Sequence, residues 1–272
     1  MGGGPQPAGI KTMKPTYGNT VSVTVEGHVA VVEFNRPPHN FASVELMRDL
    51  ADALDDIDAD RTLRASVMTG AGKSFCAGAD LASPTGVGGA GMAGVSPLYV
   101  EAVRLFSTRK PIVAAIQGAA VGAGLGLALV ADFRVVAPEA RFTANFVKLG
   151  FHPGFGVTYT LPRVVGEQRA LLMCLTGRRI KGEEALAWGL ADAMAPLEAL
   201  HGAALAFARE LAENAPLAVE ATRATLRAGL AAAVKTQTDH ELEEQTRLRA
   251  TKDFAEGVRS VNERRPGVFI GA

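Results

Sequence analysis

The 272-residue sequence predicts an α/β fold with a largely parallel sheet and a helical C-terminal region. Short apolar runs typical of buried strands alternate with amphipathic stretches typical of helices, and short glycine-rich turns join them. Beyond about Leu197 the strand pattern is absent from the sequence. Strands that alternate with helices in this way are expected to pair in parallel.

The N-terminal part predicts a hairpin, a helix and a further strand. Valines alternate with polar residues over 21–25, and the apolar run Val29–Phe34 follows a possible turn, which indicates a β-hairpin. Ser43 is a good N-cap for a helix whose apolar face extends to Ile57. Arg64–Thr69 is the next expected strand, and the small-residue segment Ala82–Gly94 after it is expected to be a mobile loop beside a site.

The segment Lys110–Asp132 is the centre of the predicted fold. Ile112–Ile116 indicates a buried strand, Leu125–Val130 a buried helix, and the turn between them is rich in glycine, with Gly118, Gly122, Gly124 and Gly126. Glycines let a ligand approach the main chain, and the first N–H groups of a helix have no internal partner. We therefore expect an electron-rich ligand at this turn, either a phosphate or a carbonyl oxygen that becomes negative during a reaction.

The remainder of the chain divides into one more strand and a set of helices. Phe133–Val136 indicates a strand, and helices are expected around 200–211, from Pro216, and around 254–261. The predicted organisation is a disordered tail over 1–19, an α/β core over 20–196 and a C-terminal helical region over 197–272.

Composition excludes several classes of partner. Lysine plus arginine equal aspartate plus glutamate at 28 each, so no global field favours nucleic acid or an anionic membrane. Cys76 and Cys174 lie far apart and form no metal-ligand spacing, which favours a reducing, cytoplasmic setting and no metal site. Glycines and Gln117 interrupt the longest apolar stretch, so a membrane span is not expected.

Four segments carry a resemblance that extends over nearly the whole chain from about Thr20. They are SFCAGADL, KPIVAAIQGAAVGAGLGLALVAD, LPRVVGEQRALLMCLTGRRIKGEEALAWGLAD and DFAEGVRSVNERRPGVF, and they resemble the enoyl-CoA hydratase/isomerase (crotonase) family in the family's order. The resemblance implies a spiral of ββα units capped by C-terminal trimerisation helices. It also implies assembly as a homotrimer or a hexamer made of two trimers, with an acyl-coenzyme A thioester as substrate.

The resemblance also assigns a role to the glycine-rich turn. Chemistry next to a thioester places negative charge on the thioester oxygen, and two preorganised N–H donors stabilise it. By similarity, these donors are the main-chain N–H groups of Ala79 and Ala123, which form an oxyanion hole.

Other residues are assigned by the same resemblance to the coenzyme. The carbonyl of Ala77 meets the adenine amino group, and Asp80 and Leu81 line the bound coenzyme near its pantetheine arm. Ala82 stands where many relatives carry a lysine for a coenzyme phosphate, so Arg36 is the candidate phosphate contact. Coenzyme A is thus expected as part of the substrate, with no permanently bound cofactor.

The sequence departs from the family pattern at the proton-transfer positions. A typical hydratase uses two glutamates that share one water, and alignment of the motifs places Gly126 and Phe146 at these positions. The acid that some isomerases carry falls near Gly154. Hydration of crotonyl-CoA is therefore expected to be weak. His152, which titrates near neutrality, and Asn145 are the candidate replacements.

Two other functions remain open. The protein could be a non-catalytic acyl-CoA-binding subunit, since both glutamates are missing. It could also bind a dinucleotide through the glycine-rich turn, although the spacing is not GxGxxG and no ribose-binding acid follows at the usual distance. Cys76 is expected to be a buried filler rather than a nucleophile, because no basic partner is evident.

Overall fold

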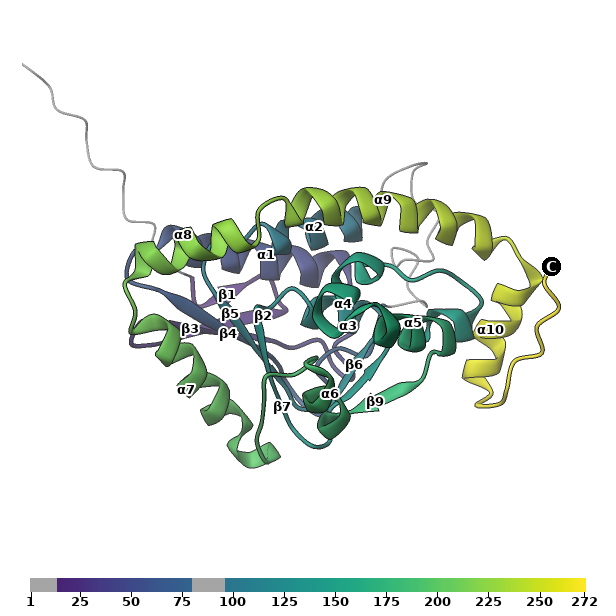
Figure 1. Cartoon of the computed structure of the whole chain (residues 1–272), viewed down its shortest axis with the longest axis horizontal. Coiled ribbons are helices and arrows are strands. Elements are labelled where there is room, and N and C mark those ends of the chain that lie inside the picture. The colour runs from purple at the N-terminus through teal and green to yellow at the C-terminus, as the bar shows by residue number, and fades with distance from the viewer. Residues whose placement is uncertain (1–13, 80–95) are drawn as a thin grey trace, which may run out of the picture.

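The main layer of the protein is a seven-stranded sheet (Figure 1), seen in a computed structural model that describes residues 14–79 and 96–272. The strand order is β1-β2-β3-β4-β5-β7-β10, antiparallel from β1 to β3 and parallel from β3 onward. The strands are β1 (Thr16–Tyr17), β2 (Val21–Glu26), β3 (Val29–Phe34), β4 (Ala65–Gly70), β5 (Ile112–Ile116), β7 (Phe133–Val136) and β10 (Ala193–Met194). The predicted hairpin and the mainly parallel pairing are confirmed.

Both faces of the main sheet are covered, as a parallel sheet requires. One face packs on α1 (Val44–Ala59), α2 (Pro97–Phe106) and α3 (Ala123–Ala128), and the other on α7 (Leu200–Ala212). Every residue of β5 is consequently buried, which explains its continuous apolar sequence. Helix α7 therefore contributes to the core of the sheet, although the sequence assigns it to the C-terminal region.

A second, three-stranded sheet lies against the first layer. It contains β6 (Ala119–Val121), β8 (Arg141–Thr143) and β9 (Arg179–Lys181), with β6 parallel to β8 and β8 antiparallel to β9. Strand β6 corrects the prediction of a simple turn between β5 and α3. Three small residues gave no alternating pattern, and their extended conformation depends on pairing with β8.

The remaining helices follow the sheets and then cover them. They are η1 (Asn145–Leu149), α4 (Val157–Val165), α5 (Glu167–Thr176), α6 (Gly182–Trp188), η2 (Leu197–Ala199), α8 (Pro216–Leu226), α9 (Leu230–Arg249) and α10 (Lys252–Asn262). Two predicted helix starts are confirmed, because the Ser43 side chain accepts from the Leu46 N–H and Pro216 begins α8. In Figure 1, α8 and α9 run along the top of the molecule, and α10 lies at one end.

Helix α9 had no clear signal in the sequence because its inward face is mostly polar. Its buried residues are Val234, Thr238, Glu241 and Gln245, which have helical spacing but little apolar surface. The Glu241 carboxylate accepts hydrogen bonds from the main-chain N–H groups of Gly156 (2.7 Å) and Thr158 (3.1 Å) at the start of α4. The Gln245 amide donates to the carbonyl of His152 at 3.0 Å. These bonds attach α9 to the segment that precedes α4.

The first strand begins before the predicted boundary at residue 19. Thr16 and Tyr17 pair with β2, and the Tyr17 side chain is buried. Its hydroxyl donates to Asp56 of α1 at 3.0 Å. This corrects the C-terminal end of the predicted tail, of which residues 1–13 lie outside the described residues.

Within residues 14–79 and 96–272, no helix has the length and apolar character that crossing a membrane requires.

Replacement of Glu241 by glutamine is expected to lower the free energy of unfolding by about 1–3 kcal/mol at pH values above the pKa of Glu241, where the carboxylate accepts from the facing N–H groups and an amide nitrogen cannot. Burial raises the pKa of Glu241. The folded wild type therefore keeps this proton where the unfolded chain has lost it, and its stability falls as pH rises from about 4.3 through the raised value. The variant lacks this pH dependence.

Urea denaturation across the acid to neutral range measures the effect of Glu241. Glu243→Gln, an exposed position on the same helix, is the control. Superimposable curves for the two variants would contradict the role of Glu241.

Candidate active site

Two chain segments lie side by side at the centre of the candidate site. Cys76 forms a parallel bridge with Ala120, because the Cys76 N–H donates to the Ala119 carbonyl at 2.8 Å and the Val121 N–H donates to the Cys76 carbonyl at 3.0 Å. The segment that follows Cys76 and the segment that leads into α3 therefore run next to each other. The structure thus brings together the two segments that contain Ala79 and Ala123.

Glycine is required where these segments meet. A Cβ atom at Gly124 would lie 2.0 Å from the carbonyl oxygen of Cys76, a distance that no side chain tolerates. Gly78 and Gly122 have φ values of +115° and +54°, which side-chain-bearing residues rarely adopt. The glycines of both segments therefore permit a backbone contact and fix the direction of the neighbouring N–H groups.

The two predicted donors have unused main-chain N–H groups in the described part of the chain. Ala123 is the first residue of α3, so its N–H has no partner within the helix. Neither the Ala123 nor the Ala79 N–H donates a hydrogen bond to another described residue. Both groups thus remain available to an acceptor.

The predicted coenzyme residues lie on the other side of the Cys76 segment. The Ala77 N–H donates to the His39 carbonyl at 3.1 Å, and Ala42 bridges to Ala79. Arg36 belongs to the same turn as His39, and its Nη1 donates to the Phe41 carbonyl at 3.4 Å. Asp80, Leu81 and the segment 82–94 lie outside the described residues.

Two buried amide side chains hold the loop before Cys76, and neither was singled out by the sequence. Asn40 donates to the carbonyls of Ala71 and Ser74 at 2.8 and 2.9 Å. Gln117 donates to the Gly70 carbonyl at 2.6 Å and also to Ser74 at 3.0 Å. The sequence offered one signal for these two side chains, which is a polar residue next to a turn. Their partners became clear because the fold brings distant loops together.

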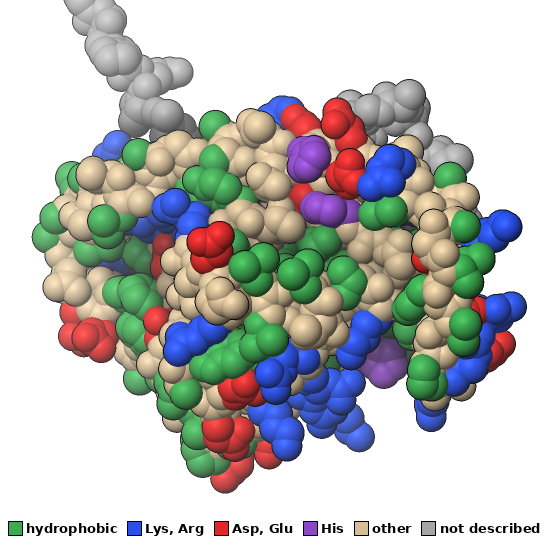
Figure 2. Space-filling view, turned by 45° about the vertical axis from the view of Figure 1, so that its right-hand side comes forward, with side chains coloured by type: hydrophobic (Ala, Val, Ile, Leu, Met, Phe, Trp, Pro, Cys, Tyr) green, Lys and Arg blue, Asp and Glu red, His purple; other side chains and the backbone are tan. Residues whose placement is uncertain are grey.

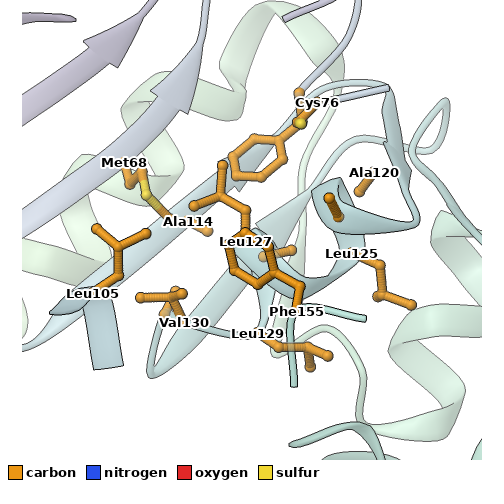
Figure 3. Close-up of a cluster of buried hydrophobic side chains, with 14 of the residues drawn as sticks. Met68, Cys76, Leu105, Ala114, Ala120, Leu125, Leu127, Leu129, Val130 and Phe155 are labelled. Atoms are coloured by element: carbon orange, nitrogen blue, oxygen red, sulfur yellow. The ribbon is translucent and has the colours of Figure 1, made fainter. Parts of the chain in front are cut away.

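Phe155 occupies the space next to Gly126. A Cβ at Gly126 would lie 2.6 Å from the Phe155 ring, and the ring is completely buried. Figure 3 shows Phe155 and Cys76 among the apolar side chains of β5 and α3. Phe155 has φ of +65°, so this packing is kept despite an unfavourable backbone conformation. The position predicted to have lost a glutamate is therefore filled from another segment.

Asn145 and Phe146 lie close to Gly122. A Cβ at Gly122 would lie 3.5 Å from the Phe146 ring and 3.6 Å from the Asn145 carboxamide oxygen. Phe146 also makes an edge contact with Phe151, with ring centroids 5.6 Å apart. The structure thus places one polar and one aromatic side chain next to the residue that precedes Ala123.

His152 has different neighbours. Its Nδ1 lies 2.8 Å from the Pro153 carbonyl, and its ring makes an edge contact with His240 of α9 at 6.0 Å between centroids. At nearby Gly154, a Cβ would lie 2.0 Å from the Tyr99 hydroxyl oxygen. The contacts of His152 are thus with its own turn and α9, whereas Asn145 lies beside Gly122.

A cysteine nucleophile receives no support here. Burial raises the pKa of the Cys76 thiol to about 11, and Cys76 is fully buried. This agrees with its interpretation as a buried filler. No group of histidine, cysteine and acidic side chains suited to a metal ion occurs among the described residues.

Comparison with known proteins identifies the family. The profile of the family described as enoyl-CoA hydratase/isomerase matches residues 24–271. A putative enoyl-CoA hydratase of Thermus thermophilus is 39% identical over 249 residues, covering 90% of this chain and 98% of that protein. A 1,2-epoxyphenylacetyl-CoA isomerase of Escherichia coli is 34% identical, covering 91% and 97%. The crystal structure of an enoyl-CoA hydratase/isomerase from Pseudoalteromonas atlantica has a TM-score of 0.83 at 28% identity, covering 93% of this chain and 100% of that one.

The chain therefore belongs to the enoyl-CoA hydratase/isomerase family and is an enzyme of that family. The family resemblance and the crotonase-like α/β fold predicted from the sequence are confirmed.

Gly124→Ala is expected to lower the free energy of unfolding by about 1–3 kcal/mol and to reduce activity, because the new methyl group forces apart the Cys76 and Gly124 segments. Gly202→Ala is the control, since Gly202 lies in α7 with no atom within 4 Å of the added Cβ. That substitution is expected to raise stability by about 0.5–1 kcal/mol. Thermal unfolding followed by circular dichroism measures both, and equal stabilisation by the two changes would contradict the close contact.

Proposed function

We propose that this protein processes acyl-CoA thioesters by stabilising negative charge on the thioester oxygen with the main-chain N–H groups of Ala79 and Ala123. The proposal rests on one observation. A bridge holds together the segments that contain Ala79 and Ala123, and neither N–H group donates to an acceptor among the described residues. One such donor typically contributes about 2.7–4 kcal/mol to transition-state stabilisation. An enolate or a tetrahedral adduct would carry the charge.

The coenzyme part of the substrate is proposed to bind beside the same segments. The Ala77 carbonyl is then the partner of the adenine amino group, and Arg36 contacts a coenzyme phosphate. Asp80 and Leu81 line the pantetheine arm. The contact of Ala77 with His39, in the turn that contains Arg36, supports this assignment, because a guanidinium is well suited to phosphate. Coenzyme A enters as part of the substrate, and no permanently bound cofactor is invoked.

The acyl side of the site favours a reaction that adds no water. By the family resemblance, Gly126 and Phe146 take the positions of the two glutamates that would hold the water of a hydratase. Phe155 fills the space beside Gly126. Asn145 is the polar side chain near Gly122 and is proposed to hydrogen-bond the acyl group. His152 is the titratable candidate in the following turn. The Escherichia coli relative is named for isomerisation of a phenyl-bearing acyl-CoA, which is consistent with aromatic surroundings.

The non-catalytic alternative has one observation in its favour. Phe155 closes the space in which a proton-transferring side chain at position 126 would act. In this alternative, the acyl-CoA pocket is retained for binding alone. A test of α-proton exchange on a phenyl-bearing acyl-CoA separates the two functions.

Exchange of the α protons of phenylacetyl-CoA in D₂O is expected to be catalysed, because the oxyanion hole stabilises the enolate. Ala123→Pro removes one N–H donor at a first helical position, which accepts proline. The exchange rate, measured by mass spectrometry, is expected to fall by about 10²–10³-fold. Ala123→Ser keeps the N–H group and should retain the rate. Equal rates for the two variants would contradict the oxyanion hole.

The same assay tests the side-chain assignments. Asn145→Ala or His152→Gln should slow exchange without loss of coenzyme A binding if the altered side chain acts on the acyl group. An unchanged rate removes that residue from the mechanism. Binding of coenzyme A with no exchange by the wild type would support the non-catalytic alternative.

Hydration of crotonyl-CoA is expected to be slow or absent, because no glutamate pair is available at the expected positions to activate water. Loss of absorbance of the enoyl thioester measures the reaction. Rapid turnover that copurifies with the folded protein through successive columns would contradict this expectation.

The active assembly is proposed to be a homotrimer or a pair of trimers formed through the C-terminal region, as the family resemblance implies. Sedimentation equilibrium of the full chain distinguishes these assemblies from a monomer.

A further inference from the structure

Arg249, the last residue of α9, carries a guanidinium group with no acidic partner in the described part of the chain. Its Nε and Nη2 atoms are buried and donate no hydrogen bond to a described residue. Burial lowers the pKa of Arg249, and the Tyr99 phenol is the group that acts in the opposite direction. An N–H group that is buried without an acceptor costs free energy, which a bound oxygen atom would recover.

Other buried arginines of the fold have acidic partners. Arg134 pairs with Asp192 at 3.5 Å, and Arg223 pairs with Asp132 at 2.9 Å. A buried guanidinium is tolerated in such places because a carboxylate compensates its charge. Arg249 has no carboxylate of this kind among the described residues, so a structural ion pair does not account for it.

The exposed face of α9 shows the usual pairing of opposite charges. Lys235 contacts Asp239 and Arg247 contacts Glu244, each at 2.6 Å. Figure 2 shows acidic, basic and histidine side chains close together along the top of the molecule, where Figure 1 places α9. The positive charge of Arg249 is not part of this surface pairing.

Arg249 lies on the face of α9 that packs on its own chain. Glu241, Gln245 and Arg249 are spaced by four residues, so their side chains share one side of the helix. The first two bond to the segment 152–158, and the Arg249 guanidinium lies 5.9 Å from the centroid of the Phe151 ring. This side of α9 is therefore covered by the chain itself and is not a surface available to a second copy.

A row of aromatic rings connects Arg249 with the candidate active site. Phe151, next to the guanidinium, makes an edge contact with Phe146 at 5.6 Å between centroids. The Phe146 ring lies 3.5 Å from the place of a Cβ at Gly122, and Gly122 precedes the proposed donor Ala123. The row thus begins beside the proposed position of the thioester oxygen and ends at a positive charge.

We propose that Arg249 binds a carboxylate at the far end of the acyl group, so that the substrates are coenzyme A thioesters of dicarboxylic acids. Nε and Nη2, the two atoms without an acceptor, form one edge of the guanidinium, and such an edge binds both oxygens of a carboxylate. The aromatic rings cover the hydrocarbon part between the two ends. This inference rests on the proposed acyl-CoA site and names its substrate class.

Calorimetric titration of the full chain compares matched thioesters. Adipyl-, pimeloyl- and suberyl-CoA are each paired with the monocarboxylic thioester of the same carbon number, from hexanoyl- to octanoyl-CoA. At least one dicarboxylic thioester is expected to bind about ten- to hundredfold more tightly than its partner, because the added carboxylate pairs with the guanidinium. Equal binding within every pair would overturn the inference.

Variants locate the carboxylate. Arg249→Gln should remove the difference within the preferred pair and leave binding of the monocarboxylic thioester unchanged. Arg247→Gln, at an exposed position on the same helix, should keep the full difference. A difference that persists in Arg249→Gln would place the carboxylate elsewhere and contradict the assignment. Thermal unfolding verifies that each variant is folded, and the wild-type pairs decide the matter if Arg249→Gln is not.

Coenzyme A alone separates this inference from the proposed function. If Arg249→Gln weakens coenzyme A as much as the dicarboxylic thioester, the guanidinium contacts the coenzyme, and the inference fails while the acyl-CoA site stands. If the wild type binds neither coenzyme A nor any thioester, the proposed site fails, and the inference fails with it. Unchanged binding of coenzyme A by the variant, with loss of the dicarboxylic preference, supports both.

Discussion

The contact between the Gly124 backbone and the Cys76 carbonyl is the constraint on which the candidate site depends. It allows two segments separated by more than forty residues to form a bridge, and it leaves space for no side chain between them. Asn40 and Gln117 hold the loop that precedes Cys76, and glycines set the backbone direction on either side. Neighbouring elements thus share one task, which is to keep two lengths of main chain close together.

The proposed donors belong to the backbone, so their positions are insensitive to side-chain identity. The acyl side of the site is different, because there the side chains determine what can react. Phe155 fills the space next to Gly126, and Phe146 lies beside Gly122. Gly126 and Phe155 therefore have complementary shapes, a small residue against a large ring. The fold is shared with the family, and the proposed chemistry depends on the side chains at these positions.

Local patterns in the sequence were sufficient for much of the fold. The hairpin, the start of α1 at Ser43 and the buried strands β5 and β7 follow from apolar periodicity and capping. The short strand β6 and the polar inward face of α9 were missed, because both depend on partners distant in the sequence. The segments of the candidate site were found through the resemblance, but the packing of Phe155 on Gly126 required the fold, since no local rule relates these residues.

The attachment of α9 has a consequence for the order in which the protein is completed. Glu241 and Gln245 hold the segment 152–158 through bonds that span 85 and 93 residues. That segment contains Phe155, which sits in a left-handed conformation against α3. During synthesis the sheet strands emerge well before α9, so an incomplete chain can assemble its sheet while the wall beside Gly126 lacks support. The candidate site is therefore completed only after α9 has been synthesised.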